Sequence, residues 1–431
     1  MRSMRTLLCF LLAVPVFADT VVFRNVTVIP MTSPKAMAEK QTVVIKDGKI
    51  ATIAKEVAVP KDATVIDGTG KYLLPGLADM HVKIPPTDAK GGMMQDVLTM
   101  LMANGITNAR GMWGSPGQLA IREKARTAKI VSPNLFLAGA QFGKQTVISP
   151  EDAIERVKSQ KKEGWDFLTI ELGLTPEQYD AIAKSAHESN MRFGGTVPVG
   201  VALPHAIESG QETIDYLDAF DIYLDAAKGP VDEKKLGEIA SKLEEAGVWV
   251  VPMLALSEIT YGTYPLETLN AYSEVKYSPQ AAVDVWAKSY ELRMQGLPRD
   301  QVANIVTNNR VILRAFRDTG VRMLLGTASL EQYLEPGFSV MREMAALRNA
   351  GLTPYEILTM ATVNPATYLG RSDIGTIETG NRADLVLLDG DPLADVTNVG
   401  KVNGVMLGGT WYNRQQLDDA LKTIKEKYRF N

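Results

Sequence analysis

The sequence predicts an α/β protein in which a TIM-like (β/α)8 barrel stands beside a small composite β-sandwich domain built from both chain ends. Eight apolar runs separated by amphipathic segments fill the middle of the chain. Short strand patterns with Asp-Gly turns precede them, and further strand patterns follow Gly370. The 431 residues, 45% hydrophobic and 22% charged, suffice for one large core and a satellite domain.

Residues 1–18 have the pattern of a signal peptide. The basic residues Arg2 and Arg5 precede an apolar run from Thr6 to Phe17, which is too short for a helix to cross a hydrocarbon core of roughly 30 Å. Val16-Phe17-Ala18 then matches a small-x-small cleavage site. We therefore expect cleavage after Ala18 and an exported protein, periplasmic or secreted; a short membrane anchor is the alternative.

Composition excludes several classes of function. Cys9, inside the apolar run, is the only cysteine, so the mature chain would have neither a thiol nucleophile nor a disulfide. The formal charge is 46 − 50 = −4, and loss of Arg2 and Arg5 gives 44 − 50 = −6. This scattered acidic charge predicts no nucleic-acid partner and, after signal cleavage, no membrane partner.

The composite β domain is predicted to comprise residues 19–75 and 371–417. Hydrophobic and polar residues alternate there, and Asp47-Gly48 and Asp67-Gly68 are interpreted as hairpin turns. A charged amphipathic pattern then predicts a C-terminal helix in residues 418–431. The predicted strand segments are Thr20–Ile29, Gln41–Ile50, Ala63–Leu74, Gly375–Asp389 and Lys401–Asn413.

The barrel is predicted to comprise residues 76–370. Thr175 and Thr353 each begin a capping box with proline at the first helical position, and Ser149 begins a close relative of that motif. The predicted barrel strands are Leu77–Lys83, Ile106–Trp113, Asn134–Gln141, Phe167–Leu172, Arg192–Val197, Thr213–Leu217, Val248–Leu254 and Arg322–Thr327.

Three phrases, LLPGLADMHV, RADLVLLDGDPL and VMLGGTWYN, resemble the amidohydrolase superfamily, and most closely its imidazolonepropionase-like and prolidase-like branch. The resemblance extends over essentially the whole mature chain, including GITNARGMW and TMATVNPATYLG. It implies the barrel fold and hydrolysis of carbon–nitrogen bonds. It also implies one or two divalent ions, zinc or another metal, at the C-terminal mouth of the barrel, where they activate a water molecule.

The resemblance further implies where the metal ligands would lie. The family pattern has His-x-His on strand 1, lysine or glutamate on strand 4, histidines on strands 5 and 6, and an aspartate on strand 8. His81 matches the first of these positions. The other five positions fall on Lys83, Thr169, Thr196, Tyr216 and Ala328. These residue types predict that no metal is bound and that the site is degenerate.

The histidine count supports the same prediction. The chain has three histidines, whereas the family site uses four, and His187 and His205 lie in segments with helical periodicity. Residues two apart on a strand face the same side, so His81 and Lys83 share a face, and so do Thr169 and Glu171. We therefore expect a pocket lined by His81, Lys83, Thr169, Glu171, Thr196, Tyr216 and Ala328.

Lys83 and Glu171 are the candidate catalytic residues, with Lys83 paired to Glu171 where a metal would stand. The pair either fills the former site or binds a polar ligand, or Lys83 acts as a base or nucleophile. Alternatively, Glu171 is a metal ligand beside His81. The four tyrosines of residues 261–277 either stack on a ligand at the mouth or pack their loop onto the barrel.

Three functions remain open from the sequence. The first is a non-catalytic exported protein that binds a small-molecule ligand or a partner. The second is a hydrolase of non-peptide or cyclic amide bonds, or of dipeptides, with an unusual or absent metal. The third is a structural subunit, either a homo-oligomer or an assembly with an active relative. The chain contains no GxSxG, Walker, GxGxxG or CxxC motif that would suggest other chemistry.

Overall fold

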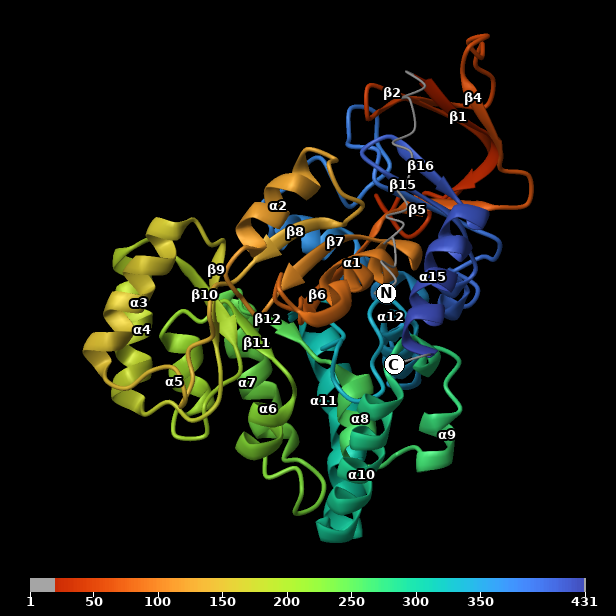
Figure 1. Ribbon diagram of the computed structural model, residues 1–431. Coiled ribbons are helices and arrows are strands. Elements are labelled where there is room, and N and C mark those ends of the chain that lie inside the picture. Colours follow the sequence, from red (N-terminus) through yellow and green to blue (C-terminus); the bar gives the residue numbers. More distant parts are fainter. Residues whose placement is uncertain (1–19, 430–431) are drawn as a thin grey trace, which may run out of the picture.

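The computed structural model describes residues 20–429, so the predicted signal peptide lies outside the described residues. Figure 1 shows two parts, a β domain containing both the red N-terminal and the blue C-terminal strands, and a larger body of alternating strands and helices. No helix between residues 20 and 429 is long and apolar enough to cross a membrane. The predicted α/β fold with its composite β domain is confirmed.

The β domain contains eight strands joined in one sheet. Their order is β16-β15-β14-β5-β1-β2-β3, and β4 pairs with β1. Antiparallel pairing of β5 with β14 joins the two ends of the chain, with Pro75 opposite Leu385. Apolar side chains such as Phe23, Ile45 and Leu387 form one buried cluster within this domain. The strands are β1 (Thr20–Val28), β2 (Ala38–Lys46), β3 (Lys49–Ala54), β4 (Thr64–Asp67), β5 (Tyr72–Pro75), β14 (Leu385–Leu388), β15 (Val402–Leu407) and β16 (Thr410–Asn413).

One of the two predicted hairpins is correct and the other is wrong. At Asp47-Gly48, β2 and β3 pair antiparallel, with Lys46 opposite Lys49. At Asp67-Gly68, the flanking strands β4 and β5 both run parallel to β1 instead of pairing with each other. The Asp67 side chain accepts a hydrogen bond from the Thr69 N–H at 3.0 Å. This contact stabilises a tight turn after which the chain continues parallel to β1 as β5.

The barrel strands follow one another in chain order and begin at or within one residue of their predicted starts. Two parallel sheets, β6-β7-β8 and β9-β10-β11-β12-β13, are connected by isolated bridges from Ala138 to Phe167 and from Val82 to Ser329. The strands are β6 (Leu77–Val82), β7 (Ile106–Gly111), β8 (Asn134–Leu137), β9 (Phe167–Ile170), β10 (Arg192–Gly195), β11 (Thr213–Asp215), β12 (Trp249–Val251) and β13 (Arg322–Met323).

The helices surround these strands. The capping boxes at Thr175 and Thr353 form as predicted, and the Ser149 side chain accepts from the Asp152 N–H. The helices are α1 (Met93–Ala103), α2 (Gln118–Arg126), α3 (Pro150–Glu163), α4 (Pro176–Glu188), α5 (Leu203–Glu208), α6 (Asp218–Tyr223), α7 (Glu233–Ala246), α8 (Leu254–Thr260), α9 (Leu266–Asn270), α10 (Gln280–Gly296), α11 (Arg299–Thr319), α12 (Ser339–Asn349), α13 (Pro354–Ala361), α14 (Val363–Tyr368) and α15 (Arg414–Arg429). Short 3-10 turns occupy η1 (Lys90–Gly92), η2 (Val275–Tyr277) and η3 (Val396–Gly400).

The terminal helix is longer than expected. It begins at Arg414, directly after β16, whereas the sequence predicted a start near Asp418. The Asn413 side chain accepts a hydrogen bond from the Gln416 N–H at 3.0 Å, and the Gln416 side chain accepts from the Asn413 N–H at 3.0 Å. This reciprocal arrangement caps the helix start, and sequence periodicity alone did not indicate it.

Candidate functional site

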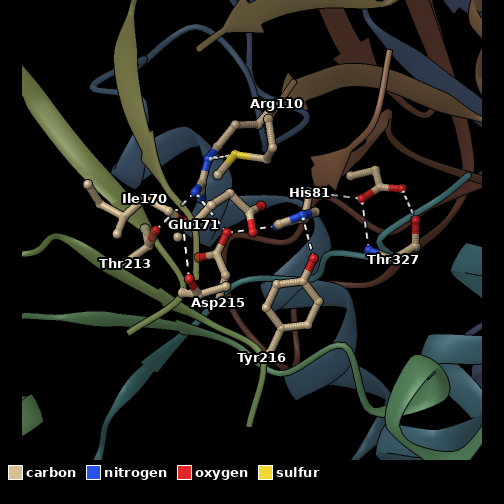
Figure 2. A network of polar contacts seen from close by, with 12 residues as sticks. His81, Arg110, Ile170, Glu171, Thr213, Asp215, Tyr216 and Thr327 are labelled. Atoms are coloured by element: carbon tan, nitrogen blue, oxygen red, sulfur yellow. Dashed lines mark hydrogen bonds and ion pairs between the residues drawn. The ribbon is translucent and has the colours of Figure 1, made fainter. Parts of the chain in front are cut away.

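A buried ionic network lies at the C-terminal ends of the barrel strands (Figure 2). His81 Nδ1, from β6, is 2.7 Å from Asp215 Oδ2, from β11. The guanidinium of Arg110, from β7, donates to the same Asp215 oxygen at 3.1 Å and to Thr213 Oγ1 at 2.9 Å. The side chains of Arg110 and Asp215 have no exposed surface, and His81 is 2% exposed. Three strands therefore bring two basic groups to one carboxylate.

Asp215 remains ionised in this network. Burial alone would raise the pKa of its carboxyl, but the Arg110 guanidinium and the His81 hydrogen bond hold that pKa below its ordinary value. Arg110 also lies over the ring of Phe167, with 5.1 Å between the guanidinium carbon and the ring centroid. The buried positive and negative charges therefore compensate each other across the barrel.

Tyr216 faces the other nitrogen of His81. Its hydroxyl lies 3.2 Å from His81 Nε2, and its backbone has a φ of 71°. Burial raises the pKa of the Tyr216 phenol, and the nearby Glu171 and Asp215 carboxylates raise it further, so the phenol keeps its proton. In the neutral tautomer in which His81 Nδ1–H donates a hydrogen bond to Asp215, Nε2 carries no proton and accepts a hydrogen bond from the Tyr216 hydroxyl. Both ring nitrogens of His81 therefore contact polar groups of the protein.

Lys83 does not pair directly with Glu171, which corrects the sequence-based prediction. The Lys83 ammonium bonds to Glu331, in the loop that follows strand 8 of the barrel. Glu171 instead accepts a hydrogen bond from the Gln141 amide at 2.9 Å. Burial raises the pKa of Glu171, while the nearby His81 and Lys83 charges lower it. Lys83 and Glu171 are therefore neighbours in one charged mouth, with different direct partners.

The other predicted pocket residues have less polar contact with this network. Thr169 is buried and its hydroxyl has no hydrogen-bond partner among the described residues. The Thr196 hydroxyl donates to the Ile170 carbonyl at 3.3 Å. Ala328 is fully buried in an apolar cluster that includes Met80. The structure thus places His81, Lys83, Glu171 and Tyr216 together, while Thr196 and Ala328 make backbone and apolar contacts.

A second buried carboxylate supports the backbone around His81. Asp79 accepts hydrogen bonds from the Thr327 hydroxyl at 2.5 Å, the Thr327 N–H at 3.1 Å and the His81 N–H at 3.2 Å. Burial raises the pKa of Asp79 to about 7, although these hydrogen bonds lower it. The carboxyl therefore links the end of β6 to the segment that follows β13.

Close packing at Gly326 fixes the position of His81. A Cβ added at Gly326 would lie 2.9 Å from His81 Cβ and 2.5 Å from Val251 Cγ1. We expect Gly326→Ala to displace His81 and to cost about 1–3 kcal/mol of unfolding free energy, the usual range for overpacking a core. Urea unfolding with a histidine NMR spectrum would measure both effects.

Gly237→Ala is the matched control for this substitution. Gly237 is exposed on α7 and nothing lies within 4 Å of its added Cβ. Alanine there should stabilise the protein by about 0.5–1 kcal/mol, because it has the higher helix propensity. If Gly326→Ala leaves both stability and the His81 resonances unchanged, the packing argument is wrong.

The residues of this site do not fit a catalytic divalent ion. Within residues 20–429, no three His, Cys, Asp or Glu side chains are gathered closely enough to hold a metal. Both ring nitrogens of His81 already face protein atoms, and Asp215 shares an oxygen with a guanidinium. A catalytic zinc takes about three protein ligands and keeps one open position.

The other two histidines and the tyrosine segment lie outside the network. His187 Nε2 contacts the Ser209 carbonyl at 2.9 Å, and His205 Nε2 contacts Asp180 at 2.7 Å. In the segment after β12, the Tyr264 hydroxyl donates to Glu258 at 2.8 Å and the Tyr277 ring stacks on Phe338. Tyr264 and Tyr277 therefore hold this segment against neighbouring elements, whereas Tyr261 lines a separate cavity.

Sequence reasoning missed Arg110, Asp215 and Glu331. Arg110 and Asp215 are ionisable residues inside short strand patterns whose other members are apolar or small, and such residues are costly to bury unless paired. That exception to the pattern could have indicated both of them. Glu331 lies beyond the end of its strand, where the two-residue alternation gives no information.

Comparisons with known proteins agree with this architecture. The model of the Amidohydrolase family matches residues 72–412. The 5-methylthioadenosine/S-adenosylhomocysteine deaminase of Pyrococcus furiosus is 25% identical over 372 residues, which cover 81% of this chain and 82% of the deaminase.

Solved structures give the same result for the fold. A Xaa-Pro dipeptidase with bound methionine has a TM-score of 0.69 at 19% identity and covers 91% of this chain and 100% of its own. Bottromycin amidohydrolase has a TM-score of 0.75 at 21% identity, with 95% and 90% covered. At these identities the structural likeness concerns the fold alone.

Proposed function

The chain belongs to the amidohydrolase family, and on that premise we propose that it is an exported member that binds a small polar ligand at the barrel mouth without a metal. The observation that carries this proposal is the buried contact of Asp215 with both His81 and Arg110. A guanidinium beside the carboxylate repels a divalent cation, while it favours ligands with negative or polar groups.

Unpartnered polar atoms support a ligand of this kind. Arg110 Nη1, Asp215 Oδ1 and Thr169 Oγ1 are buried and have no hydrogen-bond partner among the described residues. Buried polar groups are normally hydrogen-bonded, so these atoms offer a donor, an acceptor and a hydroxyl to a polar ligand or to water. Lys83 and Glu331 add one charge of each sign at the mouth.

Hydrolysis of a carbon–nitrogen bond without a metal is the second candidate. The His81 Nδ1 contact with Asp215 at 2.7 Å favours it, because a carboxylate-oriented imidazole can accept a proton from water. The deaminase of Pyrococcus furiosus acts, by its name, on adenosine derivatives, which makes amino-purine nucleosides the first substrate panel to test. Assembly with itself or with an active relative stays a prediction that a sizing experiment on the purified chain would test.

Elemental analysis of the purified protein tests the proposal most directly. We expect well below one equivalent of transition metal. We also expect no change in melting temperature on chelator treatment or zinc addition, because a metal bound to the native state would raise that temperature and its removal would lower it. His81→Gln is the informative variant, and His187→Gln is the matched control for adventitious surface binding.

The proposal would be overturned if the wild type held about one equivalent of metal, the His81→Gln variant held none and the His187→Gln variant held as much as the wild type. That result would favour a metal-dependent hydrolase.

Ligand binding is tested by a thermal-shift screen of small polar compounds. A true ligand should raise the melting temperature of the wild type and raise it less in Lys83→Met and Glu171→Gln. For export, the N-terminus of the protein recovered outside the cytoplasm should begin at Asp19.

A further inference from the structure

A cavity separate from the buried network opens between the segments that follow β11 and β12. Its volume is about 400 Å³, and its lining includes Asp218, Asp221, Asp225, Ile222, Tyr261 and Ile305. It lies at the C-terminal face of the barrel, because α6 directly follows β11. None of its lining residues belongs to the network of His81, Arg110 and Asp215 on which the proposed function depends.

Asp221 is the unusual residue of this cavity. It is 7% exposed, and neither oxygen of its carboxyl group has a hydrogen-bond partner among the described residues. The Asn309 amide, which also acts on the Asp221 carboxyl group, donates a hydrogen bond to Ser257 Oγ at 2.9 Å. Burial raises the pKa of Asp221 to about 8, Asp218 raises it further, and the Asn309 amide lowers it. A buried carboxyl group without partners is destabilising unless something else in the cavity satisfies it.

The cavity also has more acidic than basic side chains, with Asp218, Asp221 and Asp225 facing Lys228. Asp225 is paired with Lys228 at 2.7 Å, and both side chains are exposed, so this pair lies at the rim. Asp218 forms no ion pair among residues 20–429, and burial raises its pKa. Burial raises the pKa of Tyr261 too, and Asp218 and Asp221 raise it further, so Tyr261 offers a neutral ring. Ile222 and Ile305 supply apolar wall.

We propose that this cavity binds an organic cation whose protonated amine contacts Asp221 and Asp218 and whose short apolar chain lies against Ile222, Ile305 and Tyr261. Two carboxyl groups match an ammonium, which has hydrogen-bond donors only. The apolar side chains of Ile222 and Ile305 favour contact with a carbon chain over contact with a hydrated ion. A metal ion is the poorer occupant, because no three donor side chains in residues 20–429 are gathered to hold one.

Calorimetric titration with pentylamine and benzylamine hydrochlorides tests this site, with 1-pentanol as the neutral analogue. We expect saturable binding of the amines and none of the alcohol. Asp221→Asn, which keeps the shape and removes the charge, should weaken amine binding about tenfold or more, the size of a lost charged hydrogen bond. Asp225→Asn at the rim is the matched control and should bind as the wild type does.

Thermal stability makes the test independent of folding failure. Without amine, Asp221→Asn should melt at or above the wild-type temperature, because it removes a buried carboxyl group that has no partner. Wild-type protein that binds neither amine, or Asp221→Asn that binds them as tightly as the wild type, overturns the proposal. So does a lower melting temperature for Asp221→Asn, since it would assign the carboxyl group a structural partner.

Discussion

Asp215→Asn is expected to lower the free energy of unfolding by about 3–5 kcal/mol, the cost of removing one partner of a buried ion pair. The Arg110 guanidinium has no exposed surface, so it would lose its ion-pair partner without gaining water. The substitution would also replace the charged acceptor 2.7 Å from His81 Nδ1 with a neutral amide. Urea denaturation followed by circular dichroism measures the change.

Two further variants separate this network from ordinary surface charge. Asp373→Asn breaks a partly exposed pair with Arg371 and should cost at most about 1 kcal/mol. Combining Arg110→Met with Asp215→Asn should recover part of the loss, because the unpaired guanidinium is then gone. Strict additivity of Arg110→Met and Asp215→Asn would contradict coupling between the two side chains.

Raising the pH from about 4 to about 8 is expected to destabilise the protein by an amount on the order of several kcal/mol. Burial raises the pKa of Glu343 from 4.5 to about 8 and that of Glu335 from 4.5 to about 7. In that window the unfolded chain releases protons that the folded chain retains, so stability falls as the pH rises. Above the folded pKa values these groups contribute no further change. Urea midpoints measured across the range give the slope.

Glu343→Gln should flatten this pH dependence. Glu343 is fully buried and accepts the N–H groups of Leu254 at 3.0 Å and Ala255 at 2.7 Å, where α8 begins. Glutamine has one oxygen that can accept one of these two N–H groups, and it does not titrate; each pKa unit removed is worth about 1.4 kcal/mol. Glu356→Gln, at an exposed capping box, should leave the slope unchanged. An unchanged slope in Glu343→Gln would show that this carboxyl group does not cause it.

The sequence predicted the fold well because the fold follows periodic patterns. Apolar runs of strand length separated by capped helices located all eight barrel strands, with starts from Leu77 to Arg322. The errors lie where one local motif serves two geometries. Asp67-Gly68 can form the turn of a hairpin, or it can join two strands that both pair with a third strand. The parallel pairing of β4 and β5 with β1 decides between these two arrangements.

The site was less predictable, because its contacts join different strands. Alternation predicts that His81 and Lys83 share one face of the strand, but it cannot choose among several partners of opposite charge. Glu331 reaches Lys83 from a loop, and Gln141 reaches Glu171 from the segment that follows β8. The His81 contacts with Asp215 and Tyr216 span 134 and 135 residues of sequence. Such choices depend on tertiary geometry that no local pattern encodes.

The pairing of β5 with β14 has a consequence for synthesis and for engineering. Pro75 meets Leu385, so 310 residues (385 − 75) must emerge before the first domain of the chain can close its sheet. Until then β5 presents an open strand edge, which is a template for association with other chains. A fragment that ends before β14 would keep that edge, and we expect it to aggregate, whereas new termini placed in a surface loop of the barrel would keep both halves of the sheet together.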